Sequence, residues 1–154
     1  IVDTDWSGHA TVTGDNVTLN IKQGNVTTSG SSDENGLGLY INGDNTNLTV
    51  NQGDYANDQG EHKAVIDLNG NSNTGTFIQE DTGLHYLDVT LGSASHTVDI
   101  TQRGSGNHAA RVDLDGYSTD FDLIQQGSTA QSYNIDNTCS NALGCTINTT
   151  QGTQ

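Results

Sequence analysis

Apolar and polar residues alternate in short stretches that recur along the whole chain. Strict alternation is the pattern of a half-buried β-strand, and no stretch shows the period of an amphipathic helix. Six of these stretches end in a glutamine: Gln23, Gln52, Gln79, Gln102, Gln125 and Gln151. Each of the last five follows an earlier alternating stretch, and the centres of these are Leu39, Ile66, Val89, Val112 and Ile135. The chain is therefore predicted to contain only strands and turns.

The spacing within each unit is more constant than the spacing between units. From centre to glutamine the distance is 13 residues in four successive units and 16 in the last, whereas the return to the next centre takes 16, 14, 10, 10 and 10 residues. Constant spacing predicts a strand, turn, strand unit of fixed register, with length variation confined to one side. Gly and Asn, which tolerate positive φ, supply the turns at Gly14-Asp15-Asn16, Gly43-Asp44-Asn45, Asn69-Gly70-Asn71 and Asp115-Gly116.

Repetition of one residue type at one position favours stacked coils over an up-and-down antiparallel sheet. In stacked coils, equivalent residues lie about 4.8 Å apart in parallel, in-register columns. A buried column of glutamine amides satisfies itself, because each amide donates to one neighbour and accepts from the other. We therefore predict an all-β fold: a β-solenoid of about six stacked strand-turn-strand coils that form two parallel in-register sheets. The whole chain, 1–154, is expected to be one domain, with an N-terminal segment at 1–8 and the coils at 9–152.

Composition and charge exclude several classes of protein. Only 31% of the residues are hydrophobic, which is too few for a thick globular core. A formal net charge of −15 argues against nucleic acid and anionic membranes as partners, since both require a basic surface. No apolar run is long enough to insert into and span a bilayer.

Two features suggest an oxidising compartment. Cys139 and Cys145 lie six residues apart in the longer turn of the last unit, where a small-loop disulfide is predicted; a pair of free thiols is the alternative. The chain begins with Ile1 instead of methionine, as expected of a secreted protein after removal of its signal peptide, although a trimmed chain would begin in the same way.

One unit resembles a known repeat. Gln102-Arg103-Gly104-Ser105-Gly106-Asn107-His108-Ala109 is similar to the curlin repeat, Gln-x-Gly-x-Gly-Asn-x-Ala after an alternating strand, and Gln125-Gln126-Gly127 keeps its opening. The resemblance implies a secreted subunit of curli-like, functional-amyloid fibres in a biofilm matrix or at the cell surface. It also implies a homopolymer that grows head to tail, with partners for secretion and nucleation.

The ends of a solenoid suggest the same behaviour on physical grounds. Apolar inward faces and unpaired strand edges template another copy unless a polar cap covers them, and no cap is visible in the sequence. The alternative is that the segment around Trp6 folds over one end and keeps the protein monomeric, as a surface-binding module or adhesin.

Histidines and aspartates are the candidates for chemistry. His62, His85 and His108 each lie four residues before a strand centre, so stacking places them in one column. We expect this column to face solvent at a corner of the arc; convergence on Zn or Cu is the alternative. His9 and His96 lie off the column and are expected to be exposed. Outward carboxylates at equivalent positions, Asp99 with Asp122 and Asp113 with Asp136, are expected to be solvated; sharing of a divalent cation is the alternative.

Catalysis is not expected. Polysaccharide-cleaving solenoids need carboxylates paired across a groove, usually with cationic residues that hold an acidic sugar. The four cations of this chain are few and scattered: Lys22, Lys63, Arg103 and Arg111. No nucleophile elbow points to Ser-His-Asp chemistry. No cofactor is expected.

Overall fold

The computed structural model contains twelve β-strands and, within the residues that it describes, no helix. It describes residues 9–23, 35–53, 62–80, 85–104, 107–127, 131–139 and 144–152. The segment around Trp6 lies outside these ranges. No described helix is long and apolar enough to cross a membrane.

The strands form two parallel sheets of six strands each. One sheet, here called the first sheet, contains β1 (His9–Thr13), β3 (Asn35–Asn42), β5 (His62–Asn69), β7 (His85–Ala94), β9 (His108–Tyr117) and β11 (Gln131–Cys139). The second sheet contains β2 (Thr18–Gln23), β4 (Asn47–Gln52), β6 (Thr74–Gln79), β8 (Thr97–Arg103), β10 (Asp120–Gln126) and β12 (Thr146–Gly152). Each strand of the first sheet and the strand that follows it make one coil, so the chain forms six coils.

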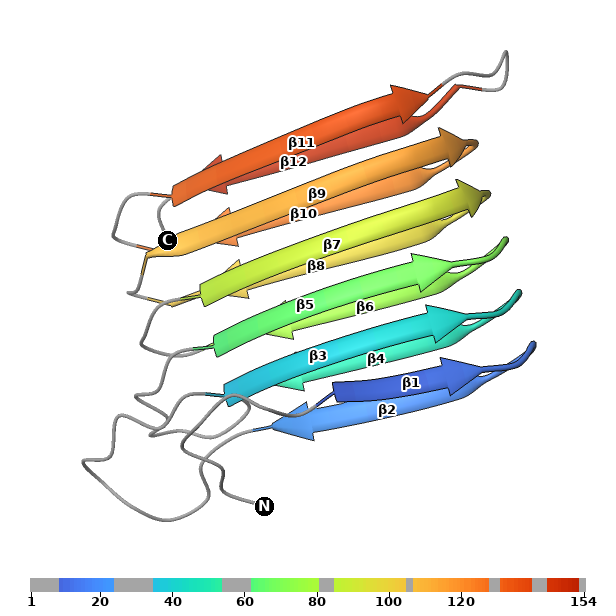
Figure 1. Cartoon of the computed structure of the whole chain (residues 1–154). Coiled ribbons are helices and arrows are strands. Elements are labelled where there is room, and N and C mark those ends of the chain that lie inside the picture. Colours follow the sequence, from blue (N-terminus) through green and yellow to red (C-terminus); the bar gives the residue numbers. More distant parts are fainter. Residues whose placement is uncertain are drawn as a thin grey trace.

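The coils stack in sequence order, and every strand pairs with its counterpart in the next coil (Figure 1). The register is the predicted one: Gln23 pairs with Gln52, and the pairing continues through Gln125 to Gln151. The predicted β-solenoid with two parallel in-register sheets is therefore confirmed. The turns predicted around Asp15 and Asp44 lie between the two strands of their coils. The turn predicted at Asp115-Gly116 is wrong, because β9 continues to Tyr117 and contains both residues.

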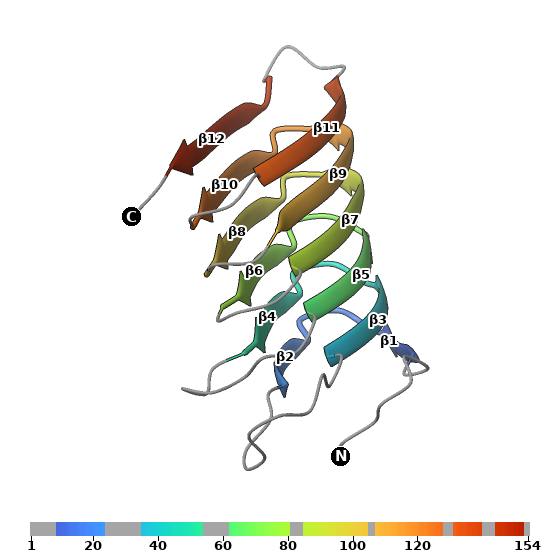
Figure 2. The same cartoon turned by 90° about the vertical axis from the view of Figure 1, so that its left-hand side faces the viewer.

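The core is a thin layer between the two sheets, which lie face to face in Figure 2. Inward side chains form aliphatic columns, and alternation along each strand keeps the other face polar. Leu39, Ile66, Val89 and Val112 make one column of the first sheet, and each is at most 4% exposed.

In β6, a glycine and a phenylalanine together fill the space that two aliphatic side chains fill in the neighbouring coils. Gly75 stands in a column where neighbouring coils carry Leu48 and Val98. The ring of Phe77 fills the space, because a Cβ on Gly75 would lie 2.8 Å from Cε2 and Cζ of that ring. Phe77 is 1% exposed and is among the largest fully buried side chains. The two residues therefore share one volume between them.

The corner between the two strands of a coil is also repeated. Asn16, Asn45, Ser72, Ser95 and Ser118 all have φ between 56° and 62°, the left-handed conformation. The next residue turns inward in four of these coils and forms a buried polar column: Thr46, Asn73, His96 and Thr119. Backbone hydrogen bonds link this column between coils; for example, Thr74 N donates to Thr46 O and Thr97 N to Asn73 O.

The last coil differs from the coils below it. Tyr133 and Asn137 are in register with the inward residues Ala110 and Leu114, and Thr149 with Leu123. All three side chains are exposed, and Thr149 Oγ1 donates to Tyr133 Oη at 3.3 Å. The last coil therefore keeps only part of the expected apolar inward face, namely Ile135 and Ile147, which are partly buried against the core. Polar groups are tolerated there because no further described coil removes them from water.

Candidate functional site

The six predicted glutamines form a continuous hydrogen-bonded ladder in the second sheet. From Gln52 onward, each amide nitrogen donates to the side-chain oxygen of the glutamine one coil earlier, at 2.7 to 2.8 Å. Gln52, Gln79, Gln102 and Gln125 are at most 2% exposed. The prediction of inward, stacked glutamines is therefore confirmed.

The amide nitrogens also tie the second sheet to the first. Gln102 Nε2 donates to the carbonyl oxygen of Ala109 at 3.1 Å, and Gln125 Nε2 donates to that of Ser132 at 2.8 Å. Gln23 makes the equivalent bond to Gly36 at 2.9 Å. Both amide hydrogens of an interior glutamine are thereby used, which fixes the amide orientation along the whole ladder.

Fixed orientation gives the ladder a direction. At one end Gln23 donates to Gly36, and within the described residues no glutamine lies beyond it to accept its second hydrogen. At the other end Gln151 donates to Gln125, and no donor in the described part of the chain reaches Gln151 Oε1. The first coil therefore presents a donor and the last coil an acceptor.

The three histidines share one column, as predicted, but the expectation that they face solvent is wrong. His62, His85 and His108 are in register on β5, β7 and β9 and are at most 1% exposed. Their rings stack, with centroids 5.0 and 4.9 Å apart and interplanar angles of 23° and 5°. Burial lowers the pKa of His108, and the backbone carbonyl of Arg103 partly opposes that shift.

His96 was also expected to be exposed, and that expectation is wrong for the same reason. It is 1% exposed in the corner column, where its Nε2 lies 2.9 Å from the carbonyl oxygen of Gly92. Burial lowers its pKa, while hydrogen bonds to the backbone of Gly92 and Asn73 oppose the shift. The side chain of His9 lies outside the described residues.

The signal that locates these buried histidines is present in the sequence. An even separation along a strand keeps two residues on the same face. His62 lies four residues before the buried Ile66, and His96 lies two residues before the buried Val98. Parity therefore places His62 inward, because β5 begins at that residue. His96 lies one residue before β8 begins, so its inward position follows from the repeated corner column that it shares with Thr46 and Asn73.

The described residues offer no cluster suited to a metal ion: no group of three or more His, Cys, Asp or Glu is arranged to hold one. The nitrogen lone pairs of imidazoles stacked face to face lie in parallel ring planes and do not point toward a common centre. Ligands of one metal ion must point toward the ion from different directions. The geometry therefore does not favour the Zn or Cu alternative for the histidine column.

The aspartate pairs lie next to each other, as their spacing predicts. Asp99 is in register with Asp122, and Asp113 with Asp136. Partial burial and the carboxylates of Asp122 and Asp120 raise the pKa of Asp99. Asn148 Nδ2 donates to Asp122 Oδ1 at 2.7 Å. The two pairs therefore lie on different sheets. In the pair on the second sheet the carboxylates repel each other, and the amide of Asn148 partly relieves that repulsion at Asp122.

The residues that carry the curlin resemblance lie where the second sheet returns to the first. Gly104 and Asn107 flank this return, Ala109 is the second residue of β9, and Ser105 and Gly106 lie outside the described residues. Gly127 has a φ of 149°, and a Cβ there would overlap the carbonyl oxygen of Gly104. Glycine is therefore required where the end of β10 passes over the previous coil.

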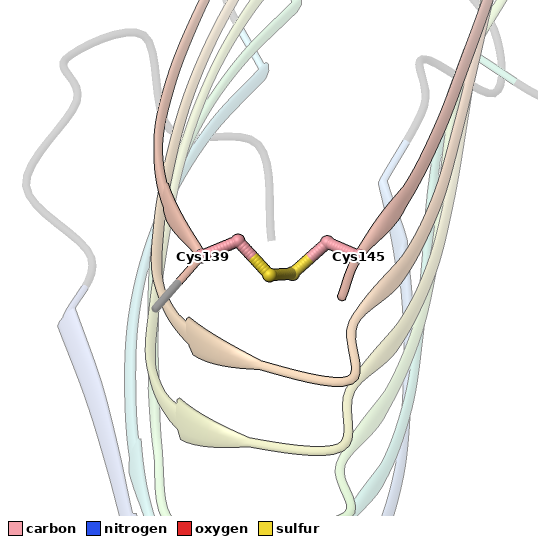
Figure 3. Close-up of a disulfide and its surroundings, with 2 residues drawn as sticks. All are labelled: Cys139 and Cys145. Atoms are coloured by element: carbon pink, nitrogen blue, oxygen red, sulfur yellow. A yellow bond between two sulfur atoms is a disulfide. The ribbon is translucent and has the colours of Figure 1, made fainter. Parts of the chain in front are cut away.

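The predicted disulfide is present. Cys139 and Cys145 are bonded, with their Cα atoms 6.1 Å apart, across the turn of the last coil (Figure 3). Cys139 is in register with Gly116, so the bond lies directly above the corner of the preceding coil. A backbone hydrogen bond from Ser118 N to Gly144 O, 2.8 Å long, ties the two corners together.

The two end coils present the surfaces most suited to contact with another molecule. The outer edges of β1 and β2, and those of β11 and β12, pair with no described strand. The partly buried apolar side chains that pack against the core at these ends are Val12, Leu19, Ile21, Ile135 and Ile147. Unpaired parallel edges beside apolar side chains are templates for further strands.

Comparisons with protein-family models, with curated proteins and with solved structures gave no match to this chain. The functional interpretation therefore depends on the geometry described above.

Proposed function

We propose that this protein is a structural subunit that assembles end to end into extracellular fibres, the last coil of one copy stacking on the first coil of the next. The observation that carries the proposal is the direction of the glutamine ladder. In such a junction, the amide hydrogen of Gln23 that donates to no described residue of its own copy meets the side-chain oxygen of Gln151, which accepts from no described residue. The bond repeats the one that joins every pair of coils.

The other columns fit the same junction. Continuing the register places the incoming Leu19 over Ile147 and the incoming Ile21 over Thr149. Strand pairing adds several backbone hydrogen bonds, each contributing about 0.5 to 1.5 kcal/mol. The contact joins two different surfaces and does not close on itself, so it makes filaments and not rings.

The disulfide supports an extracellular location, because such bonds persist in oxidising compartments. The curlin resemblance of residues 102–109 points the same way, towards a fibre of a biofilm matrix or cell surface. Secretion and nucleation partners belong to this proposal. Catalysis does not, and neither does binding of nucleic acid.

The test places positive charge on the inward face of the terminal strand. We expect the double variant Ile147→Lys, Thr149→Lys to stop filament growth, because ammonium groups cannot be buried against Leu19 and Ile21 of another copy. The matched control, Asn148→Lys with Thr150→Lys, adds the same charge to outward positions of the same strand. Electron microscopy and light scattering measure growth.

Filaments from the control but not from the inward variant would support the junction. Unchanged filaments from the inward variant would show that the contact lies elsewhere. Loss of growth in both variants would mean that net charge, and not the end face, controls assembly, and would remove the support for this junction.

One observation favours a second candidate, a monomeric solenoid that acts as an adhesin or surface-binding module. The polar inward residues Tyr133, Asn137 and Thr149 make the last coil resemble a cap. If the wild-type protein remains monomeric at high concentration and neutral pH, this second function is the better description.

A further inference from the structure

The stacked histidines of β5, β7 and β9, here called the histidine stack, have no part in the proposed fibre contact. They lie inside the three middle coils, one ring above another, at centroid distances of 5.0 and 4.9 Å. Three titratable rings at most 1% exposed are costly to keep unless they are neutral. The same column continues above with Gln131, whose side chain does not titrate.

The glycines that follow β4 and β10 pack against two rings of the histidine stack. A Cβ on Gly53 would lie 2.8 Å from Nε2 of His62, and one on Gly127 would lie 2.9 Å from Cε1 of His108. The facing positions of the second sheet carry the amides of the glutamine ladder, which are neutral at every pH. The rings are therefore packed among groups that cannot relax far to accommodate a charge.

Among the described residues, two ion pairs and one lysine lie on the strand segments next to the stack. Arg103 and Glu80, next to the ladder on the second sheet, pair with each other at 3.2 Å. On the outward face of the first sheet, Arg111 pairs with Asp88 at 3.4 Å, and Lys63 lies over the ring of Tyr86 at 5.7 Å. Neither β3 nor β11 adds a charge to the column, since it continues there as Asn35 and Gln131.

Protonation changes the balance in this site. A first imidazolium would lose its hydration, and a second about 5 Å away would repel it through an interior of low dielectric constant. In the unfolded chain each histidine takes up its proton near pH 6.5 without these costs. The unfolded state therefore binds more protons than the folded state below that pH, and acid favours unfolding.

We propose that the histidine stack is an acid-sensitive latch, which holds the three middle coils together while its imidazoles are neutral and releases them in mildly acidic medium. The latch acts on folding and does not depend on the fibre contact. Its stabilising effect is complete above pH 6.5, the ordinary pKa of a histidine in the unfolded chain, and declines as the pH falls below that value. With three sites, the unfolding equilibrium constant rises by at most about a thousandfold per pH unit in that range.

The test is the pH dependence of unfolding of the full chain, measured by denaturant titration from pH 5 to 8 at a concentration where it is monomeric. The triple variant His62→Gln, His85→Gln, His108→Gln places in each coil the residue that Gln131 already supplies in this column. We expect it to lose most of the acid dependence between pH 5 and 6.5. The matched control, His96→Asn, removes one buried histidine outside the stack, in a column that already contains Asn73, and changes the dependence by no more than one proton.

The proposal would be supported if the triple variant loses most of the pH dependence of the free energy of unfolding, while the control changes that dependence by one proton or less. An unchanged slope in the triple variant, or an equal loss in the control, would overturn it. If the triple variant does not fold, NMR titration of the imidazole signals in the wild-type protein decides the matter. Three buried rings that remain neutral well below pH 6.5 support the latch, whereas titration at or above pH 6.5 contradicts it.

Discussion

The middle coils and the last coil share one strand register but are stabilised by different interactions. From β5 to β10 the inward positions are mostly aliphatic side chains, aromatic rings, imidazoles and hydrogen-bonded amides, nearly all of them fully buried. In β11 and β12 the corresponding positions include Tyr133, Asn137 and Thr149, and the turn is closed by a disulfide. The middle coils are stabilised by neighbours on both sides, and the last coil has a described neighbour on one side only.

The comparison indicates that register and burial are separable in this fold. Backbone pairing and the glutamine ladder set the register, and they extend unchanged into the last coil. Hydrophobic burial supplies stability only where another coil covers the side chain. The covalent bond across the turn is a further source of stability in the last coil, whose outer side no described strand covers.

The largest expected difference between the two regions concerns their apolar residues. Phe77→Ala should reduce the free energy of unfolding by about 3 to 5 kcal/mol, because the ring also fills the space above Gly75. Ile147→Ala should cost about 1 kcal/mol, because that side chain is only partly buried. Denaturant unfolding of both variants measures the difference, and equal losses would contradict it.

The disulfide should matter to the last coil alone. In the double variant Cys139→Ser, Cys145→Ser, the short loop of sequence separation 6 is no longer closed, which should cost about 2 kcal/mol. We expect hydrogen exchange to accelerate in β11 and β12 and to stay unchanged in β5 to β10. Faster exchange throughout the chain would show that the last coil supports the others.

The smallest expected effect concerns the outward carboxylates. Asp99→Asn removes repulsion with Asp122 and should stabilise the protein by about 0.2 to 1 kcal/mol at pH 7. The pKa of Asp99 is raised, so the wild-type protein recovers this stability as the pH falls through that pKa, and the gain from the variant should vanish there. Asp88→Asn is the control of opposite sign, because it removes the pairing with Arg111. Thermal unfolding at pH 7 and at pH 4 compares the three proteins; a gain from Asp99→Asn that persists at pH 4 would exclude charge repulsion as its cause.

Most of the fold could be predicted because the chain repeats itself. A constant interval of 13 residues before the glutamines fixes both the register and the direction of the strands. The ladder followed from the chemistry of a primary amide, which can donate and accept along one line. The disulfide was predicted from two cysteines six residues apart in one turn of a chain expected to be secreted, and the structure decides against the alternative of free thiols.

The burial of the histidines does not follow from residue type, which favours exposure, but from position along the strand. A histidine at a strand end is usually solvated, but the strands here extend to His62, His85 and His108. Parity with the strand centre carried the correct answer. The stacking of the rings could not be predicted from the sequence, because ring orientation depends on side-chain packing, including the contacts of Gly53 with His62 and of Gly127 with His108.

The spacing of 23 residues between successive glutamines has a consequence for how such a chain can change over generations. Gln79, Gln102 and Gln125 are separated by that interval, and one full coil lies in each gap. Removal of residues 80–102 would join Gln79 to Arg103 and set β5 beside β9 and β6 beside β10. Every column would close over the gap, with His62 against His108 and Phe77 against Leu123. A whole coil is therefore a unit that recombination can delete or duplicate in one event, so the length of the solenoid can evolve separately from its cross-section.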